Sequence, residues 1–243
     1  MNNMLKITIL TNSTSWMCKY DLKLKDELEK LGHTVKIIHK KEEILKGDIT
    51  FFLSCFEIIS SRYLKLSKNN IVVHASNLPH GKGWSPSTWQ IIEGKNDIPI
   101  TLFEATDSVD AGDYYIKDLL HLCGFELIDE WQEKLGLKIV EMCLSYIKQY
   151  ETIKGKKQVG VETFYPKRNP SDSELDINKT IKEQFNLLRT VDNEKYPVFF
   201  IIDGKVYKIA ISVIKNVNGG GLYRASNHHL HISAIFSKET RYA

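Results

Sequence analysis

Short apolar runs and helical patterns alternate over the first part of the chain. The apolar runs are rich in β-branched residues and predict strands at 5–10, 35–38, 49–53 and 71–74. Leucines at 22, 24, 28 and 31 predict a helix that ends at Gly32, and residues 58–66 predict a second one. Strands that alternate with helices favour a mostly parallel sheet of the nucleotide-binding type.

A long helix closes this first unit. Two more predicted strands, at 98–103 and 114–116, bracket the polar loop 104–112, and a helical pattern then runs from Leu127 to about Tyr150. Residues 154–157 are polar, so we place a domain boundary near residue 155. The first predicted domain is therefore residues 1–155.

The remaining residues, 156–243, have a different pattern. Residues 172–188 predict a capped helix, and the apolar runs at 198–202 and 206–213 are joined by Asp203-Gly204, a strong hairpin signal. A last strand is predicted at 230–236. The predicted fold is α/β, with a Rossmann-like first domain and a small C-terminal α+β domain.

Composition and charge exclude several classes of protein. The chain has 243 residues and is 42% hydrophobic, which suffices for a core and excludes disordered or fibrous classes. Lys and Arg number 33 against 30 Asp and Glu, and their scatter does not predict nucleic-acid binding. The Cys residues lie far apart without a Cys-x-x-Cys pair, which indicates reduced thiols. No cleavage site or apolar stretch of ~20 residues is present, so a cytoplasmic protein without membrane contact is expected.

Two loops carry the candidate chemistry. Residues 74–86, His-Ala-Ser-Asn-Leu-Pro-His-Gly-Lys-Gly-Trp-Ser-Pro, follow a predicted buried strand and are dense in turn-forming residues. Residues 108–113, Ser-Val-Asp-Ala-Gly-Asp, follow later. Ligands of such sheets bind outside the carboxyl ends of the strands, where both loops are expected to project.

The two loops together resemble the folate-dependent formyltransferases, which include methionyl-tRNA, glycinamide ribonucleotide and nucleotide-sugar formyltransferases. That family's signature is Asn-x-His-x-Ser-Leu-Leu-Pro, then Arg-Gly, then Val-Asp-x-Gly. Here His74, Ser76, Leu78 and Pro79 match the first motif, Lys82-Gly83 replaces Arg-Gly, and residues 109–112 match the last. Residues 164–168, Asp176, the predicted helix to Arg189 and residues 196–200 resemble the accessory domain of sugar formyltransferases.

One position departs from the family pattern. The family's Asn, two residues before the His, is Val72 here, so the amide that helps to hold the formyl oxygen is missing. We expect Asn77 or a nearby backbone N–H to take over part of that role, although Asn77 could equally shape the turn. The sequence of residues 74–86 most resembles that of enzymes that act on 4-amino nucleotide sugars on the way to nonulosonic acids such as pseudaminic acid.

The resemblance implies an enzyme that uses 10-formyltetrahydrofolate as co-substrate and needs no metal. Its catalytic residues would be His74, Asp110 and Asn77, with His74 donating to the formyl oxygen or relaying a proton and Asp110 orienting the imidazole. The expected cofactor-binding residues are Ser54, Cys55, Phe56, Ile58, Ile59, Leu78, Pro79, Glu104, Ala105, Thr106, Val109 and Asp110. The expected acceptor-binding residues are Lys82, Gly83, Trp84, Tyr165, Lys167, Arg168 and Tyr196.

Other features also have plain structural interpretations. Trp84 and Trp89 could be core aromatic residues. His228, His229 and His231 invite a metal interpretation, but the sequence shows no third ligand on the face shared by His229 and His231. Residues 218–221, Asn-Gly-Gly-Gly, fit a hairpin turn better than a phosphate cradle.

Three functions are compatible with these residues. The leading one is N-formylation of a nucleotide-linked 4-amino sugar, with a UDP-linked 4-amino-4,6-dideoxy sugar as the expected acceptor and a homodimer among the expected states. The second is formylation of an aminoacyl or peptide-carrier amine. The third is a folate- or nucleotide-binding module without catalysis, for which Val72 is the strongest argument.

Overall fold

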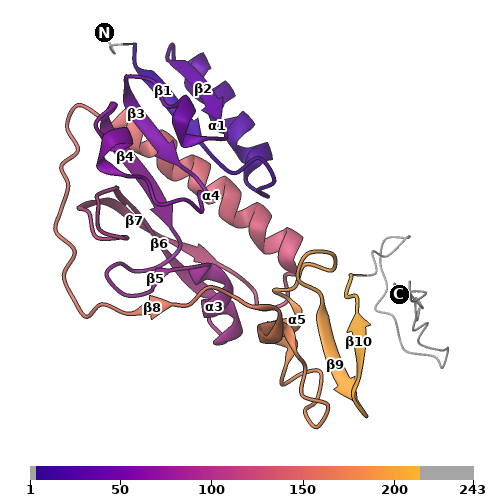
Figure 1. Cartoon of the computed structure of the whole chain (residues 1–243). Coiled ribbons are helices and arrows are strands. Elements are labelled where there is room, and N and C mark those ends of the chain that lie inside the picture. Colours follow the sequence, from indigo (N-terminus) through magenta and orange to yellow (C-terminus); the bar gives the residue numbers. More distant parts are fainter. Residues whose placement is uncertain (1–3, 214–243) are drawn as a thin grey trace, which may run out of the picture. The chain divides into compact units, whose positions relative to one another are not determined.

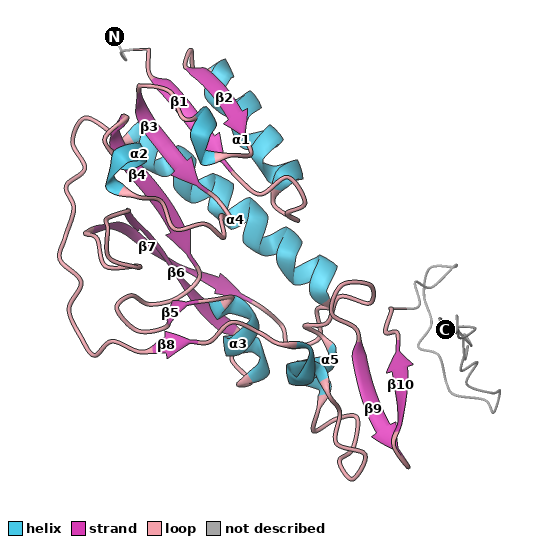
Figure 2. Ribbon diagram, in the orientation of Figure 1, coloured by secondary structure: helices cyan, strands magenta, loops and turns pink. Residues whose placement is uncertain are grey.

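The computed structural model describes residues 4–213. Its centre is a six-stranded sheet in the order β2-β1-β3-β4-β6-β7 (Figures 1 and 2). The strands are β1 (Lys6–Leu10), β2 (Thr34–Ile38), β3 (Gly47–Phe52), β4 (Ser67–His74), β6 (Asp97–Glu104) and β7 (Tyr114–His121). β1 to β4 pair in parallel, whereas β6 is antiparallel to both β4 and β7. The predicted mostly parallel sheet is confirmed, and the loop between β6 and β7 is short enough for an antiparallel pair.

Helices of different length cover the two faces of the sheet. The long helices α1 (Cys18–Lys30) and α4 (Ile128–Lys148) pack with inward residues such as Ile9 and Phe51 in the main core. The short elements η1 (Lys41–Glu43) and α2 (Ser61–Leu64) cover part of the opposite face, where Leu10 and Phe52 point. Consecutive residues of one strand therefore enter different cores, as strand alternation requires.

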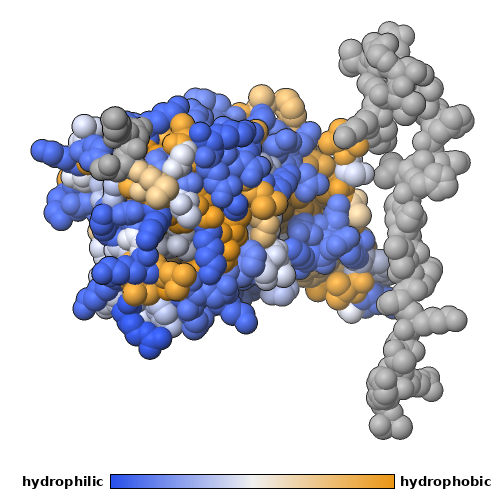
Figure 3. Space-filling view, turned by 90° about the horizontal axis from the view of Figure 1, so that it is seen from above, coloured by the Kyte–Doolittle hydropathy of each residue, from blue (hydrophilic) through white to orange (hydrophobic). Residues whose placement is uncertain are grey.

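The remaining elements are short. They are β5 (Lys82–Gly83), α3 (Pro86–Ile92), β8 (Phe164–Tyr165), η2 (Pro170–Ser173), α5 (Phe185–Leu188), β9 (Val198–Ile202) and β10 (Lys205–Ile209). The hairpin of β9 and β10 is confirmed, because Asp203 and Gly204 both have positive φ, 49° and 75°, as a two-residue turn of this kind needs. Seen from above, polar residues cover most of the molecule and apolar residues gather in patches between them (Figure 3).

Two predicted helices are wrong in extent. The helix expected at 58–66 is the single turn α2, and the one expected at 172–188 is replaced by η2, a loop and the single turn α5. Side chains in that loop bond to nearby backbone: Asp176 accepts from the N–H of Asn178 at 2.9 Å, and Glu183 accepts from that of Thr180 at 2.7 Å. Such local bonds compete with helical ones, which is why the apolar spacing misled the prediction.

A buried arginine ties the later residues to the sheet domain. Arg189 is fully buried; its guanidinium donates to Asn96 at 2.6 Å and lies 3.5 Å from the Glu126 carboxylate. Its carbonyl accepts from the indole of Trp131 at 3.0 Å. Residues up to Ser212 form one compact unit, and the boundary expected near residue 155 stays a prediction.

Several sequence predictions fall outside the described residues or concern the whole chain. The strand at 230–236, the turn at 218–221 and His228, His229 and His231 lie outside the described range.

The four cysteines, Cys18, Cys55, Cys123 and Cys143, are free thiols. Within residues 4–213, no helix is both long and apolar enough to cross a membrane.

The core contains one unusual acid, Asp21 on α1. Its side chain is fully buried, and neither carboxylate oxygen has a hydrogen-bond partner among the described residues. Burial raises the pKa of Asp21 to about 7, because an unpaired charge is costly away from water. The folded protein therefore holds a proton on Asp21 at a pH where the unfolded chain has released it.

This proton predicts a pH-dependent stability. As pH rises from about 4 to about 7, the free energy of unfolding should fall by up to about 4 kcal/mol through Asp21 alone, since the native state binds the extra proton. Asp21→Asn should remove this fall, whereas Asp26→Asn, at an exposed position of the same helix, should not. Urea unfolding at about pH 5 and about pH 8 measures how far the free energy of unfolding falls between the two. An equal fall for wild type and Asp21→Asn would contradict the assignment.

Candidate active site

His74 is the last residue of β4 and stands in a cross-strand row. It pairs with Thr101 of β6, and Thr101 pairs in turn with Lys117 of β7. Directly paired residues of antiparallel strands point to the same face of a sheet. The three side chains therefore line up beneath the loop that follows β4, which we call the motif loop, residues 75–81.

The backbone carbonyls of the motif loop are held by the elements around it. Gln90 of α3 donates to Ala75 O at 2.7 Å, Thr101 donates to Ser76 O at 2.6 Å, and Lys117 donates to Leu78 O at 2.8 Å. His74 itself contacts Gly81 O through Nε2 at 2.9 Å. These bonds fix the loop from several sides, and within it the Leu78–Pro79 peptide bond is cis.

The structure brings His74 and Asp110 together. His74 Nε2 lies 3.8 Å from Asp110 Oδ2, and both side chains are largely buried. Asp110 has a φ of 49°, in the left-handed region, and its Oδ2 accepts from the N–H of Gly83 at 2.9 Å. Gln158 donates to the main-chain oxygen of Asp110 at 3.0 Å. The predicted convergence of the two motifs therefore exists in the fold.

Gly112 fixes the course of the second motif. A Cβ added at Gly112 would lie 1.7 Å from the carbonyl oxygen of Glu104, because the two backbone segments pack directly against each other. The next residue, Asp113, accepts from the N–H of Glu104 at 2.9 Å. Only glycine fits here, which gives a physical reason for the glycine of the Val-Asp-x-Gly pattern.

Residues 156–168 form a strap that sequence reasoning missed. β8 of this strap pairs in parallel with β5, and Thr163 accepts from the N–H of Gly81 at 2.8 Å through its hydroxyl. Gln158, also on the strap, holds Asp110. The resemblance of residues 164–168 to an accessory domain did not predict these contacts, because Gln158 and Thr163 belong to no motif.

Two of the expected acceptor-binding residues are engaged within the protein. Lys82 has a side chain only 3% exposed, and its ammonium pairs with Glu162 of the strap at 2.5 Å. Tyr165 donates through its hydroxyl to Glu93 at 3.0 Å. Trp89, for which a core role was open, donates its indole N–H to Pro166 O at 2.8 Å. These contacts hold the strap against Lys82 of β5 and against α3 with the residue that follows it.

Of the other expected acceptor-binding residues, Trp84 and Lys167 contact each other. The Trp84 ring stacks on Phe56 with centroids 6.0 Å apart, and the Lys167 ammonium lies 5.2 Å from the Trp84 ring centroid. Arg168 is half-buried and donates to the Ser173 hydroxyl at 3.0 Å, and burial lowers its pKa. Tyr196 lies 48% exposed before β9. Gly83 lies between Lys82 and Trp84 and contacts Asp110.

The expected cofactor-binding residues fall on two loops and the motif loop. Residues 54–59 follow β3, Glu104 ends β6 and residues 105–110 follow it, with Phe56, Ile58 and Val109 more than half exposed. Leu78 and Pro79 are buried residues of the motif loop. Glu104 is different: its carboxylate accepts from Asn69 at 3.0 Å and Tyr115 at 2.9 Å, and burial raises its pKa.

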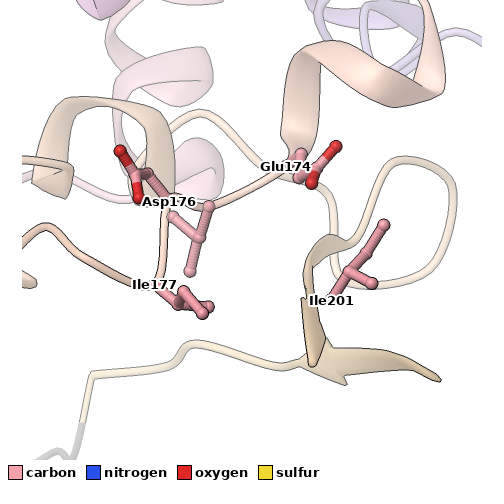
Figure 4. A pocket seen from close by; sticks show the side chains of 5 residues that line it. Glu174, Asp176, Ile177 and Ile201 are labelled. Carbon is pink, nitrogen blue, oxygen red and sulfur yellow. The ribbon is translucent and has the colours of Figure 1, made fainter. Parts of the chain in front are cut away.

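Two hollows in the described part of the chain differ in their relation to the motifs. One of about 350 Å³ adjoins the second motif and is lined by residues that include Thr106, Ala111, Gly112 and Lys157. The other, of about 310 Å³, lies between residues 174–177 and Ile201, where Glu174 and Asp176 bring negative charge (Figure 4). The first flanks Asp110, whereas the second is built from residues of neither motif.

Known proteins with similar sequences are methionyl-tRNA formyltransferases. The protein from Mycoplasma capricolum is 27% identical over 186 residues, which cover 73% of this chain and 57% of that protein. The chain thus spans little more than half the length of this relative. No family model matches the chain.

Solved structures show the same fold. Methionyl-tRNA formyltransferase from Clostridium thermocellum has a TM-score of 0.74 at 22% identity, over 88% of this chain and 96% of that one. A 4-N formyltransferase from Francisella tularensis gives 0.65 at 20%, over 87% and 99%. HypX from Aquifex aeolicus in complex with tetrahydrofolic acid gives 0.69 at 18%, over 84% and 37%. The chain is thus similar in sequence to methionyl-tRNA formyltransferases and has the fold of solved formyltransferase structures.

The contact at Gly112 gives a direct test of the site's backbone. Gly112→Ala should separate the second motif from Glu104 and lower both the free energy of unfolding and any activity of the site, because a Cβ cannot fit beside the carbonyl. Gly32→Ala is the control: Gly32 has a φ of 88° but nothing within 4 Å, so only about 1–2 kcal/mol of backbone strain is expected. Urea unfolding compares the two, and a smaller loss for Gly112→Ala than for Gly32→Ala would refute the packing argument.

Proposed function

We propose that this chain transfers the formyl group of 10-formyltetrahydrofolate to an amine, with His74 and Asp110 as catalytic residues. The observation that carries the proposal is their approach to 3.8 Å, although they come from motifs far apart in the sequence. A matching sequence pattern alone could arise without a site. A pattern whose separate parts meet at one point supports a common chemical task.

The contacts of His74 suggest how its ring is used. Because a carbonyl oxygen only accepts, the contact with Gly81 O places a proton on Nε2 and leaves the lone pair of a neutral ring on Nδ1. Nδ1 can then take up a proton during the reaction. The imidazolium formed in this way would be stabilised by the Asp110 carboxylate, whose Oδ2 is oriented by the N–H of Gly83.

The reaction needs two proton movements and one group transfer. The amine nitrogen attacks the formyl carbon, the bond from that carbon to N10 of the folate breaks, and a formamide and tetrahydrofolate result. The attacking nitrogen loses a proton, which Asp110 can accept directly or through water, and this proton, relayed by His74, is delivered to N10. Hydrogen-bond donors near the formyl oxygen stabilise the negative charge that develops there, and Asn77 on the motif loop is our candidate.

The loops on either side of this pair suit a flat heterocycle. Phe56, Ile58 and Val109, on the loops that follow β3 and β6, are 54%, 77% and 51% exposed, which is high for apolar side chains. A pterin ring placed against such side chains would remove them from water and could bond to loop backbone groups. The co-substrate supplies the formyl carbon, and the protein supplies the orientation and the proton transfers.

For the acceptor we propose the amine of a nucleotide-linked 4-amino sugar. The sequence of residues 74–86 resembles that of enzymes of this kind. The fold is shared with a 4-N formyltransferase and other sugar N-formyltransferases. Trp84, with Lys167 beside its ring, offers a surface for a base or sugar and a positive charge for a phosphate. Lys82 contributes less than expected, because Glu162 already neutralises its charge.

An aminoacyl amine is the second candidate. It is favoured by the sequence relatives, which are methionyl-tRNA formyltransferases. The scattered charges and the small net charge of +3 give no sign of a broad basic surface for RNA. We therefore rank the sugar first.

Assays with different acceptors separate these functions. The purified chain is incubated with 10-formyltetrahydrofolate and, in separate reactions, a UDP-linked 4-amino-4,6-dideoxy sugar, its dTDP counterpart, methionyl-tRNA and an aminoacylated peptide carrier. Formamide product on a sugar, read by mass spectrometry, supports the first candidate, and product only on an aminoacyl group supports the second. No product with any of them favours a binding module without catalysis.

Substitution of the central pair should remove activity without unfolding the chain. His74→Ala and Asp110→Asn should each lower kcat by about 10²- to 10⁴-fold, the range expected when a group that transfers or stabilises a proton is lost. The matched controls are His121→Ala and Asp97→Asn, because these residues form an exposed pair at 2.7 Å on the same sheet. Wild-type kcat in either site variant would remove that residue from the mechanism.

A further inference from the structure

The missing amide at position 72 leaves the formyl oxygen without its usual partner. Val72 lies on β4 and packs beside the core cluster of Leu10, Phe52 and Tyr63. Valine has no polar group, so any donor for the oxygen must come from elsewhere. Asn77 carries the nearest side-chain amide in sequence after His74, and its surroundings show how it is oriented.

Lys117 binds the Asn77 amide through its oxygen. The ammonium lies 2.7 Å from Asn77 Oδ1 and 2.8 Å from Leu78 O. An ammonium only donates, so it must face the amide oxygen and not the nitrogen. The amide nitrogen, Nδ2, is thereby directed away from the lysine and keeps its hydrogen atoms for another acceptor.

The partners of Lys117 leave its charge uncompensated. They are two neutral oxygens and the ring of Tyr114, whose centroid is 4.7 Å from the ammonium. Among the residues that the structure describes, no carboxylate comes within ion-pair distance of it, unlike Lys138, which pairs with Asp118 and Glu141 at 3.1 and 3.0 Å. Burial lowers the pKa of Lys117, as expected for a partly desolvated cation without an acid beside it.

An uncompensated cation polarises what it binds. Positive charge at the amide oxygen draws electron density from the nitrogen, so the Nδ2 hydrogens become stronger donors, and this effect grows where water is excluded. The position of the lysine is set by the sheet: Lys117 pairs with Thr101, which pairs with His74. One row of the sheet thus carries the imidazole, a support for the motif loop and the cation.

We propose that Lys117 is a positioning residue, which orients and polarises the Asn77 amide so that Nδ2 donates to the formyl oxygen as negative charge develops on it. This inference rests on the proposed function and deepens it. Lys117 touches neither substrate and acts through Asn77. The pair would replace the amide that Val72 cannot provide.

A double-mutant cycle tests the coupling. The variants are Lys117→Met, Lys117→Gln, Asn77→Ala and the double variant Lys117→Met with Asn77→Ala, assayed with the best acceptor. Asn77→Ala should lower kcat by about 10²-fold, the size expected for one oxyanion donor, and Lys117→Met should lower it by about tenfold or more, with KM little changed. Lys117→Gln, which can donate but carries no charge, should lie between wild type and Lys117→Met.

The decisive comparison is the effect of Lys117→Met in the two backgrounds. If Lys117 acts through Asn77, Lys117→Met should lower kcat much less once Asn77 is alanine, and the remaining loss reports its bond to Leu78 O. Equal losses in both backgrounds, or an unchanged kcat in Lys117→Met, would overturn the inference. Lys138→Met is the control for loss of a lysine beside β7, and thermal unfolding shows whether each variant is folded.

Failure of this inference can be told from failure of the proposed function. A wild-type chain that forms no formamide with any acceptor overturns both. An active wild-type chain whose variants lose kcat additively overturns only the role of Lys117.

Discussion

The site depends on the backbone of one loop being held from beneath and from the side. Residues 75–81 leave β4 directly after His74, and side chains of Gln90, Thr101 and Lys117 bind carbonyls of this loop. His74 donates to a carbonyl of the same loop, Gly81 O, so the loop also sets the direction of the imidazole ring. A ring that turned freely would present its lone pair at random, so this constraint supports the proposed role of His74 as a proton acceptor.

A second constraint brings the carboxylate to the ring. Asp110 follows β6 in a left-handed conformation, and Gly112 lets the chain pass directly against Glu104. The N–H of Gly83 then holds Asp110 Oδ2 within 3.8 Å of His74. Gly83 belongs to β5, which pairs with β8 of the strap, so residues beyond 155 take part in building the site. The predicted boundary near 155 would separate segments that share these contacts.

Sequence reasoning was successful where a pattern repeats and where motifs are specific. The sheet strands and α4 follow from periodicity, and the hairpin at Asp203-Gly204 follows from turn chemistry. His74 and Asp110 followed from motif resemblance, and the fold brings them together. These features depend on short stretches of sequence or on a known pairing.

Features that depend on three-dimensional contacts were missed. The helix expected at 172–188 lost to bonds between side chains and nearby backbone, such as that of Asp176 with Asn178. Lys82 looked like a phosphate partner, but Glu162, eighty residues later, already binds it. Lys117, Gln158 and Thr163 belong to no motif, and their roles depend on strand register and on the path of the strap.

The most direct test of the central claim follows the formyl carbon itself. With carbon-13-labelled 10-formyltetrahydrofolate and the amino-sugar acceptor, a single-turnover NMR experiment should show the label moving to a formamide with wild-type protein. With His74→Ala or Asp110→Asn the label should stay on the folate while tetrahydrofolate still binds. If the label stays on the folate with wild-type protein and every amine, or moves at the wild-type rate in both variants, the account is wrong.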